Sequence, residues 1–179
     1  MRVIVRGMLA GTIVELSIDI GFGDALEPAA ERRRLASFLA EDPAAEVYAY
    51  EVGPVLAEKV ETLFARFPLI EHRLKDLLDV VVPAQQEALD GAALLASFRA
   101  TFERRGTAFE ERVLDQLVEE LRGRRWSERW AVMRREKAVA MAADVTEAVL
   151  AFDTFVRPVL RAMRDGAPLG AWSPAQGWT

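Results

Sequence analysis

One lysine in this sequence lies on a helical stripe that is otherwise apolar, and its position suggests chemistry. Leu56, Val60 and Leu63 recur at the spacing of a single helix face, which predicts a helix over residues 54–66. Lys59 lies three residues after Leu56 and four before Leu63, so it belongs to the same stripe. A lysine in that position is unusual, because burying an ammonium group without a partner is costly.

A second predicted helix, over residues 71–82, carries a group of charged side chains. Arg73, Asp76 and Asp79 project from one face at i, i+3 and i+6, and Lys75 lies among them in the sequence. Cations of this kind neutralise phosphate oxygens, and a carboxylate can hold Mg²⁺ or accept a proton. An inward-facing lysine followed by such a helix therefore indicates phosphate and metal chemistry.

An ordinary structural role accounts for the same residues. Lys59 can pass the edge of a core and keep its ammonium group in water. Arg73 with Asp76, and Lys75 with Asp79, also fit surface ion pairs worth roughly a few tenths of a kcal/mol on one helix. Spacing alone leaves both interpretations open.

The composition excludes several kinds of site. The 179 residues include no cysteine and a single histidine, His72, so thiolate chemistry and a multi-histidine zinc site are excluded. A metal site in this chain would use oxygen ligands, which favours Mg²⁺ or Mn²⁺. No uninterrupted apolar run is long enough to span a bilayer, and the N-terminus does not resemble a signal peptide. We therefore expect a cytoplasmic protein without a membrane partner.

The formal net charge of −5 is unevenly distributed. Residues 122–137 hold seven basic side chains against two glutamates, and Trp126 and Trp130 lie four residues apart within them. A basic helix that bears aromatic rings can bind a nucleic-acid backbone and stack on bases. The candidate RNA-binding residues are Arg124, Arg125 and Arg129. The alternative is that the tryptophans anchor a core and the arginines form a solvated face.

A β-hairpin is predicted at the start of the chain. Residues 2–8 and 12–20 form two alternating stretches on either side of an Ala-Gly turn. Apolar side chains of the second stretch share one face, and we expect that face to pack on the helix over residues 54–66. These side chains are Val14, Leu16, Ile18 and Ile20.

The remaining patterns predict an α+β protein. Residues 31–39 suggest a short helix and residues 46–50 a third strand. The helices expected after Pro83 cover residues 91–104, 109–121, 126–141 and 144–164, with Gly106 ending the first and Pro158 kinking the last. The expected parts are a small β-rich lobe with flanking helices over residues 1–85, and an all-helical bundle with a Gly/Pro/Trp-rich tail, lying as an extended strap, over residues 86–179.

Five segments, in order along the chain, resemble the AbiEii/AbiGii family of nucleotidyltransferase-like toxins. The matching segments are residues 17–24 (SIDIGFGD, similar to VDIGFGD), 57–61 (AEKVE, similar to AEKLEA), 73–79 (RLKDLLD, similar to RxKDxxD), 98–107 (FRATFERRGT) and 172–178 (WSPAQGW). The resemblance covers nearly the whole chain.

The resemblance implies a fold, an activity and partners. The fold would be a partial nucleotidyltransferase of the polymerase-β type, with a small antiparallel sheet and flanking helices, followed by an all-helical C-terminal bundle. The activity would be that of a toxin in a bacterial type IV toxin–antitoxin system with a role in phage defence, transferring a nucleotide from an NTP to an RNA acceptor, tRNA in some relatives. The implied cofactor is Mg²⁺, and the implied partner is a cognate winged-helix antitoxin.

The resemblance also assigns roles to individual residues. Asp19 would be a metal-binding or base carboxylate, Lys59 would contact the NTP phosphates, and Asp76 would be a catalytic or orienting carboxylate. The supporting substrate-binding residues would be Arg73, Lys75 and Asp79.

The sequence departs from the family pattern at its start. Family members begin with a Gly-Gly or Gly-Ser loop and an Asp-x-Asp strand that holds the metal, and Met1 lies after the point where that segment should end. We therefore expect two of the metal-binding carboxylates to be absent and the chain to be truncated, and inactive or incomplete as an enzyme. The alternative is a non-catalytic protein that binds a nucleotide, RNA or an antitoxin. An unpaired edge of the first hairpin also predicts association with a second copy.

Overall fold

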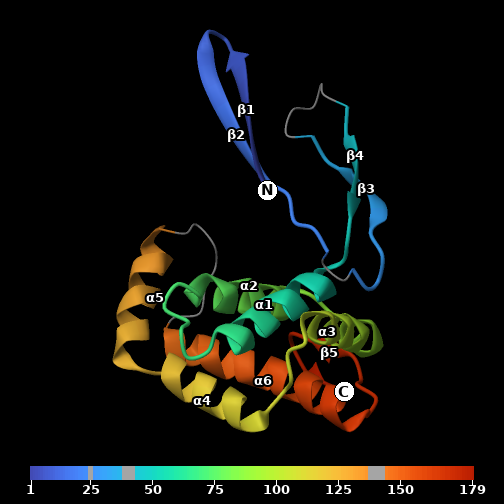
Figure 1. The fold of residues 1–179 in the computed structure, drawn as a ribbon, viewed down its shortest axis with the longest axis vertical. Helices are drawn as coiled ribbons and strands as arrows, with labels where there is room; N and C mark the ends of the chain where they lie inside the picture. The colour runs from blue at the N-terminus through green and yellow to red at the C-terminus, as the bar shows by residue number, and fades with distance from the viewer. Residues whose placement is uncertain (24–25, 38–42, 137–143) are drawn as a thin grey trace.

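The computed structural model describes residues 1–23, 26–37, 43–136 and 144–179. It consists of a helical body from which two β-hairpins project (Figure 1). The long strands are β1 (Arg2–Leu9), β2 (Thr12–Asp19), β3 (Glu31–Leu35) and β4 (Ala45–Ala49). The helices are α1 (Val52–Arg66), α2 (Leu74–Gln86), α3 (Gly91–Arg105), α4 (Glu111–Leu121), α5 (Arg124–Glu136) and α6 (Val145–Asp165). Two short strands, β5 (Trp172–Ser173) and β6 (Gly177–Trp178), follow. The chain is therefore mixed helix and strand, in agreement with the α+β prediction.

The predicted first hairpin is confirmed, and its turn follows from two residues. Ala10 and Gly11 have φ angles of 47° and 81°. Positive φ at both central positions is the conformation of a two-residue turn whose twist matches that of the flanking strands. The turn places Leu9 opposite Thr12 and Arg2 opposite Asp19 in an antiparallel ladder.

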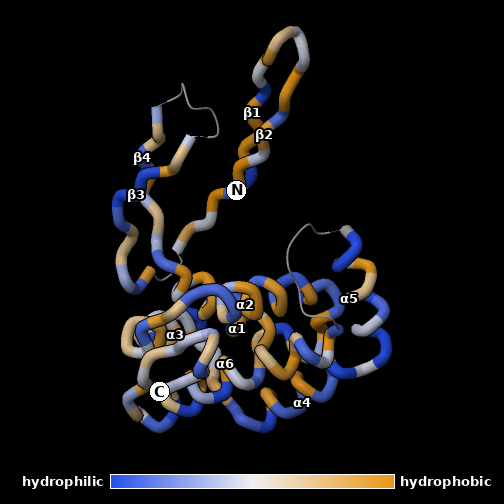
Figure 2. The backbone as a smooth tube through the Cα atoms, turned by 180° about the vertical axis from the view of Figure 1, so that it is seen from behind, coloured by the Kyte–Doolittle hydropathy of each residue, from blue (hydrophilic) through white to orange (hydrophobic). Residues whose placement is uncertain are grey.

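The apolar face of this hairpin does not pack on α1. Val14, Leu16 and Ile18 are all exposed, Leu16 to 59%. Our expectation that this row lies against the helix was wrong, because the hairpin points away from the helices (Figure 2). The buried face of α1 is instead covered by α2 and α3.

Residues 31–35 form a strand, which corrects the start of the helix expected over residues 31–39; residues 38 and 39 lie outside the described residues. In this segment β3 pairs with β4, placing Arg33 opposite Val47 and Arg32 opposite Tyr48. Val47 and Tyr48 are of residue types that favour strands. Pairing with them outweighs the weak helix preference of residues 31–35. The strand expected over residues 46–50 is confirmed as β4. Among the described residues these strands form a hairpin of their own and do not join β1 and β2 in one sheet.

A shared hydrophobic core holds the helical body together. Its centre is α6, which packs against α2, α3, α4 and α5. The largest fully buried side chains include Trp126, Trp130, Phe98, Phe152 and Phe155. Burial of each such side chain stabilises the fold by roughly 1.5–3 kcal/mol or more.

The helices predicted over residues 54–66 and 71–82 and those predicted after Pro83 are confirmed, with ends that differ by a few residues. Capping accounts for several of those ends. Asp90 and Asp144 are N-caps that accept hydrogen bonds from the main-chain N–H of the third residue after each. Gly106 ends α3 in the left-handed conformation with φ of 65°, as its position in the sequence predicted. The part of the helix expected over residues 137–141 lies outside the described residues.

The C-terminal tail lies against the helical body, as expected of a strap. Its two short strands pair so that Trp172 lies opposite Trp178. The Trp172 indole N–H donates to the carbonyl of Ala84 at 2.7 Å, and that of Trp178 donates to the carbonyl of Phe155 at 3.0 Å. Trp172 thus buries its ring and Trp178 partly does so, while each indole N–H keeps a partner.

None of the described helices combines the length and the apolarity that crossing a membrane requires. The division at residue 85 stays a prediction, and α1 and α2 share the core with α3 and α6.

Candidate functional site

The structure brings Lys59 together with two aspartates of the next helix. Its ammonium Nζ lies 3.3 Å from Oδ1 of Asp76 and 3.5 Å from Oδ2 of Asp79. Two more cations flank these carboxylates, because Arg73 Nη1 is 3.4 Å from Asp76 and Lys75 Nζ is 3.9 Å from Asp79. We call these five residues the charged cluster. The sequence predicted each of them, and α1 and α2 assemble them by packing side by side.

Burial within the charged cluster is graded from its centre to its rim. The Asp76 side chain is 9% exposed, those of Lys59 and Asp79 are each 27% exposed, and that of Lys75 is 66% exposed. A buried carboxylate held by a lysine and an arginine is fixed in position, whereas the cations at the rim can meet a ligand. Lys59 therefore does more than pass the core edge into water, since it holds both aspartates.

The surroundings of Lys59 decide its protonation. Burial by itself lowers the pKa of the ammonium, but the negative charge of Asp76, its hydrogen bond and the charge of Asp79 outweigh that effect. The pKa of Lys59 therefore lies above 10.5. Lys59 is a cation at neutral pH and can bind an anion but cannot accept a proton.

Asp19 lies elsewhere, at the end of β2. Its carboxylate accepts two hydrogen bonds from Arg2, at 2.7 and 2.8 Å, and both side chains are exposed. The hydrogen bond from Arg2 is the main reason that the pKa of Asp19 is lowered. The described structure gives Asp19 no contact with the charged cluster, and its partner is the strand opposite.

The metal implied by the resemblance can be tested against the available donors. Two or three converging carboxylates are needed to hold the ions that bridge a triphosphate. In residues 1–23, 26–37, 43–136 and 144–179, no three His, Asp or Glu side chains gather in a way that could hold a metal ion. Both aspartates of the charged cluster already pair with Lys59. The described residues therefore do not fit a Mg²⁺ site.

The tryptophans of α5 are core residues and not stacking platforms. Trp126 and Trp130 are almost completely buried, so the idea that they stack on bases was wrong. The guanidinium groups of Arg125 and Arg129 lie over the Trp126 ring, 5.0 and 5.6 Å from its centroid. Both arginines also contact Glu71, Arg125 through the carboxylate and Arg129 through the main-chain carbonyl. They therefore hold α5 against the segment before α2.

Arg124 differs from these two arginines. Its side chain is 92% exposed and makes an ion pair with Glu128 on the same helix at 3.2 Å. An exposed pair of this kind contributes little to stability. Of the three candidate RNA-binding residues, Arg124 is the one most available to a ligand.

One buried carboxylate on α1, that of Glu61, was not among the predicted site residues. Glu61 is 2% exposed, and it accepts hydrogen bonds from Arg105 at 2.7 Å and from the Thr107 hydroxyl. Its spacing held a clue, because Glu61 lies four residues after Ala57 and three before Phe64, both of which are buried. This contact fastens the end of α3 to α1.

A family model identifies the class to which the chain belongs. The class is that of nucleotidyltransferase toxins in toxin–antitoxin systems. The matching model is described as "Nucleotidyl transferase AbiEii toxin, Type IV TA system", and it covers residues 3–157. The chain therefore belongs to the AbiEii family, as the sequence resemblance indicated. No curated protein matches the chain, and no solved structure matches it.

Proposed function

We propose that the charged cluster binds the phosphates of a nucleoside triphosphate, as part of the nucleotidyltransferase chemistry of the AbiEii family. One observation carries the proposal: Lys59, a partly exposed cation, is held between Asp76 and Asp79 with Arg73 and Lys75 at the rim. Three cations against two carboxylates leave a net positive charge for phosphate oxygens.

Each residue of the charged cluster has a role in this proposal. Lys59 and Arg73 contact phosphate oxygens, and the more exposed Lys75 contacts the phosphate that lies furthest out. Asp79 holds the ammonium group of Lys59 from the second side. Asp76 is an acceptor in a low-dielectric position, suited to orient a hydroxyl group of the acceptor molecule. The acceptor of the family reaction would be an RNA, in the cytoplasm of a cell that also makes a winged-helix antitoxin, and transfer would need metal-binding carboxylates that the described residues do not bring together.

A second candidate is binding of NTP without turnover. It is favoured because the described residues do not gather the carboxylates that a metal pair needs. The charged cluster is complete without them, so the two candidates share the NTP site and differ only in the transfer step.

Incubation with labelled NTPs, Mg²⁺ and total tRNA separates the two candidates, while equilibrium dialysis measures binding. For the 179-residue chain we expect NTP binding without labelled RNA. Lys59→Ala should weaken binding at least tenfold, because one ion pair with phosphate is lost. Arg112→Ala, on the exposed surface of α4, is the matched control and should bind as the unmodified chain does.

Two outcomes would contradict the expected binding without transfer or the assignment of the phosphate site. Labelled RNA that disappears in Asp19→Ala would show that this chain carries out transfer with Asp19. Equal NTP binding by Lys59→Ala and the unmodified chain would remove the charged cluster as the phosphate site.

We also propose that α5 binds the RNA backbone, through Arg124, Arg125 and Arg129. Their positive charges face solvent in part, and phosphate binding by such residues weakens as salt rises, because counterions are released. Replacing all three by Glu should abolish RNA binding. Since Arg125 and Arg129 also hold α5 in place, Arg124→Glu alone gives the cleaner test. Arg124→Glu should weaken RNA binding and reduce by about one the slope of log affinity against log salt concentration. Arg112→Glu is the control and should change neither quantity. Unchanged RNA affinity in Arg124→Glu would mean that α5 has only a structural role.

A further inference from the structure

A recess lies at the base of the hairpins, on the side of α1 that faces α3 and away from Lys59. It has a volume of about 270 Å³. Its flat and apolar surfaces come from Tyr50, Pro54 and Leu26, and main chain lines it at Gly21 and Gly23. Ligand sites for larger molecules usually measure about 300–1,000 Å³. The recess therefore suits a ring system with part of a sugar, and it is too small for a whole nucleoside triphosphate.

Two arginines and one glutamate line this recess, and the buried Glu61, which pairs with Arg105 outside the lining, brings the charges to two against two. Arg105 lies 3.2 Å from the carboxylate of Glu58 and also binds Glu61. Arg104 donates from Nε to the main-chain carbonyl of Gly23 at 3.0 Å, which fixes the loop against α3. The side chain of Thr101 also lines the recess. Donors and acceptors without a clear excess of charge suit an uncharged heteroaromatic ring better than a phosphate.

The position on α1 connects this recess with the charged cluster. Glu58 lines the recess, and Lys59, the next residue, contacts Asp76 and Asp79 of α2. Side chains of adjacent helical residues diverge by about 100°, on a helix about 10–12 Å wide. A ligand that lies across the exposed side of α1 can therefore place a ring in the recess and an anionic chain at the charged cluster.

We propose that the recess lined by Tyr50, Pro54 and Glu58 is the base subsite of the nucleotide whose phosphates bind the charged cluster. The inference rests on the proposed phosphate site and adds the place where the base lies. The base stacks on the Tyr50 ring, which is half-exposed at the end of β4 and free to be covered. Glu58 and Thr101 supply acceptor and donor groups to the edge of the base.

The test compares a ligand that has a base with one that has none. The probes are the four common NTPs and inorganic tripolyphosphate, measured by equilibrium binding. Tyr50→Ala should weaken NTP binding about tenfold through the loss of stacking and leave tripolyphosphate binding unchanged. Tyr50→Phe keeps the ring and should bind NTP like the unmodified chain. Tyr48→Ala is the matched control, because Tyr48 is the only other tyrosine, is exposed on β4 and does not line the recess.

The outcomes separate this inference from the function on which it rests. NTP binding that is unaffected by Tyr50→Ala, while Lys59→Ala weakens both NTP and tripolyphosphate, would overturn the base subsite and leave the phosphate site standing. An equal loss in Tyr50→Ala and Tyr48→Ala would also overturn it, since the effect would not belong to the recess. If neither probe binds the unmodified chain, the phosphate site and the base subsite both fail.

Discussion

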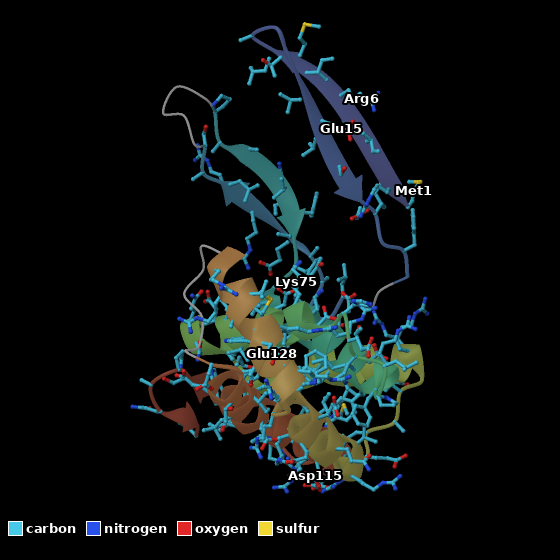
Figure 3. The ribbon with its side chains drawn as sticks, turned by 90° about the vertical axis from the view of Figure 1, so that its left-hand side faces the viewer. Met1, Arg6, Glu15, Lys75, Asp115 and Glu128 are labelled. Atoms are coloured by element: carbon cyan, nitrogen blue, oxygen red, sulfur yellow. The ribbon has the colours of Figure 1, made fainter. Side chains whose placement is uncertain are left out.

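In the helical body each apolar stripe is covered by another helix, whereas the β1–β2 hairpin has an apolar face that nothing described covers. Leu56, Val60 and Leu63 of α1 are completely buried. Leu16 and its neighbours on β2 alternate as regularly but remain exposed. The ion pairs differ in the same way, since Arg6 and Glu15 of the hairpin lie together in the open, well away from the helices (Figure 3).

The comparison shows what periodicity can establish. It identifies the face that an element is built to bury, but it does not identify what covers that face. For the helices the cover comes from the same helical body. The two faces of the hairpin also differ, because the face opposite to Leu16 carries the ion pairs of Arg2 with Asp19 and Arg6 with Glu15. The apolar face thus has the composition of an interface.

Truncation of one large side chain in each region should give the largest contrast. Trp126→Ala removes a completely buried ring and should reduce the free energy of unfolding by about 3–5 kcal/mol. Leu16→Ala should change it by less than about 0.5 kcal/mol, because the side chain is already exposed. Urea denaturation followed by circular dichroism measures both. A large loss in Leu16→Ala would mean that the hairpin face is covered in solution.

Carboxylates should repeat the contrast on a smaller scale. Glu61→Gln should destabilise the chain by about 1–3 kcal/mol, since Glu61 is buried with Arg105 and Thr107. Glu15→Gln, in an exposed pair with Arg6, should cost about 0.2–1 kcal/mol at most. The same denaturation assay applies, in low and in high salt. Only the effect of Glu15→Gln should shrink in high salt, and equal losses in both variants would contradict the difference in burial.

Self-association should reveal the uncovered hairpin. We expect the chain to pair with a second copy through the free edge of β1–β2. Ile4→Pro removes an N–H that faces away from β2, because hydrogen-bonded pairs alternate along the ladder from Met1 and Ile20, and it should shift the sedimentation coefficient toward that of a monomer. Val47→Pro makes the same change in β4 and is the matched control. A monomer at high concentration in the unmodified chain would end this proposal.

Acid sensitivity should show the smallest difference. Hydrogen bonds from Arg161 and then Arg164 lower the pKa of Glu111 below its usual 4.5. A lowered pKa in the folded state means that the stabilisation is present above about pH 4.5 and is lost as the pH falls through the lowered value. Glu111→Gln should therefore flatten the pH dependence of thermal unfolding below pH 4.5. Asp19→Asn is the control, because Arg2 also lowers the pKa of Asp19. This variant should leave the unfolding of the helical body unchanged, since the hairpin shares no core with it. An equal effect of Glu111→Gln and Asp19→Asn would contradict this prediction.

Most helices and the first hairpin could be predicted from the sequence, because local features specify them. The stripe of α1, the glycine after α3 and the Ala-Gly turn each act within a few residues. The segment over residues 31–35 could not be predicted in this way. Its arginines by themselves favour a helix, and pairing with β4, ten or more residues further along, made it a strand.

The sequence by itself determined which residues of the candidate site carry charge and which helix faces they occupy, since a period of 3.6 residues fixes Lys59 on the stripe of α1 and Asp76 and Asp79 on one side of α2. Only the tertiary structure decided which groups meet. Packing of α1 on α2 placed Lys59 between both aspartates, and the strand register gave Asp19 to Arg2 instead. The physical reason is that local spacing is set by bonded geometry, whereas contacts between distant segments depend on how whole faces pack, which no short stretch of sequence contains.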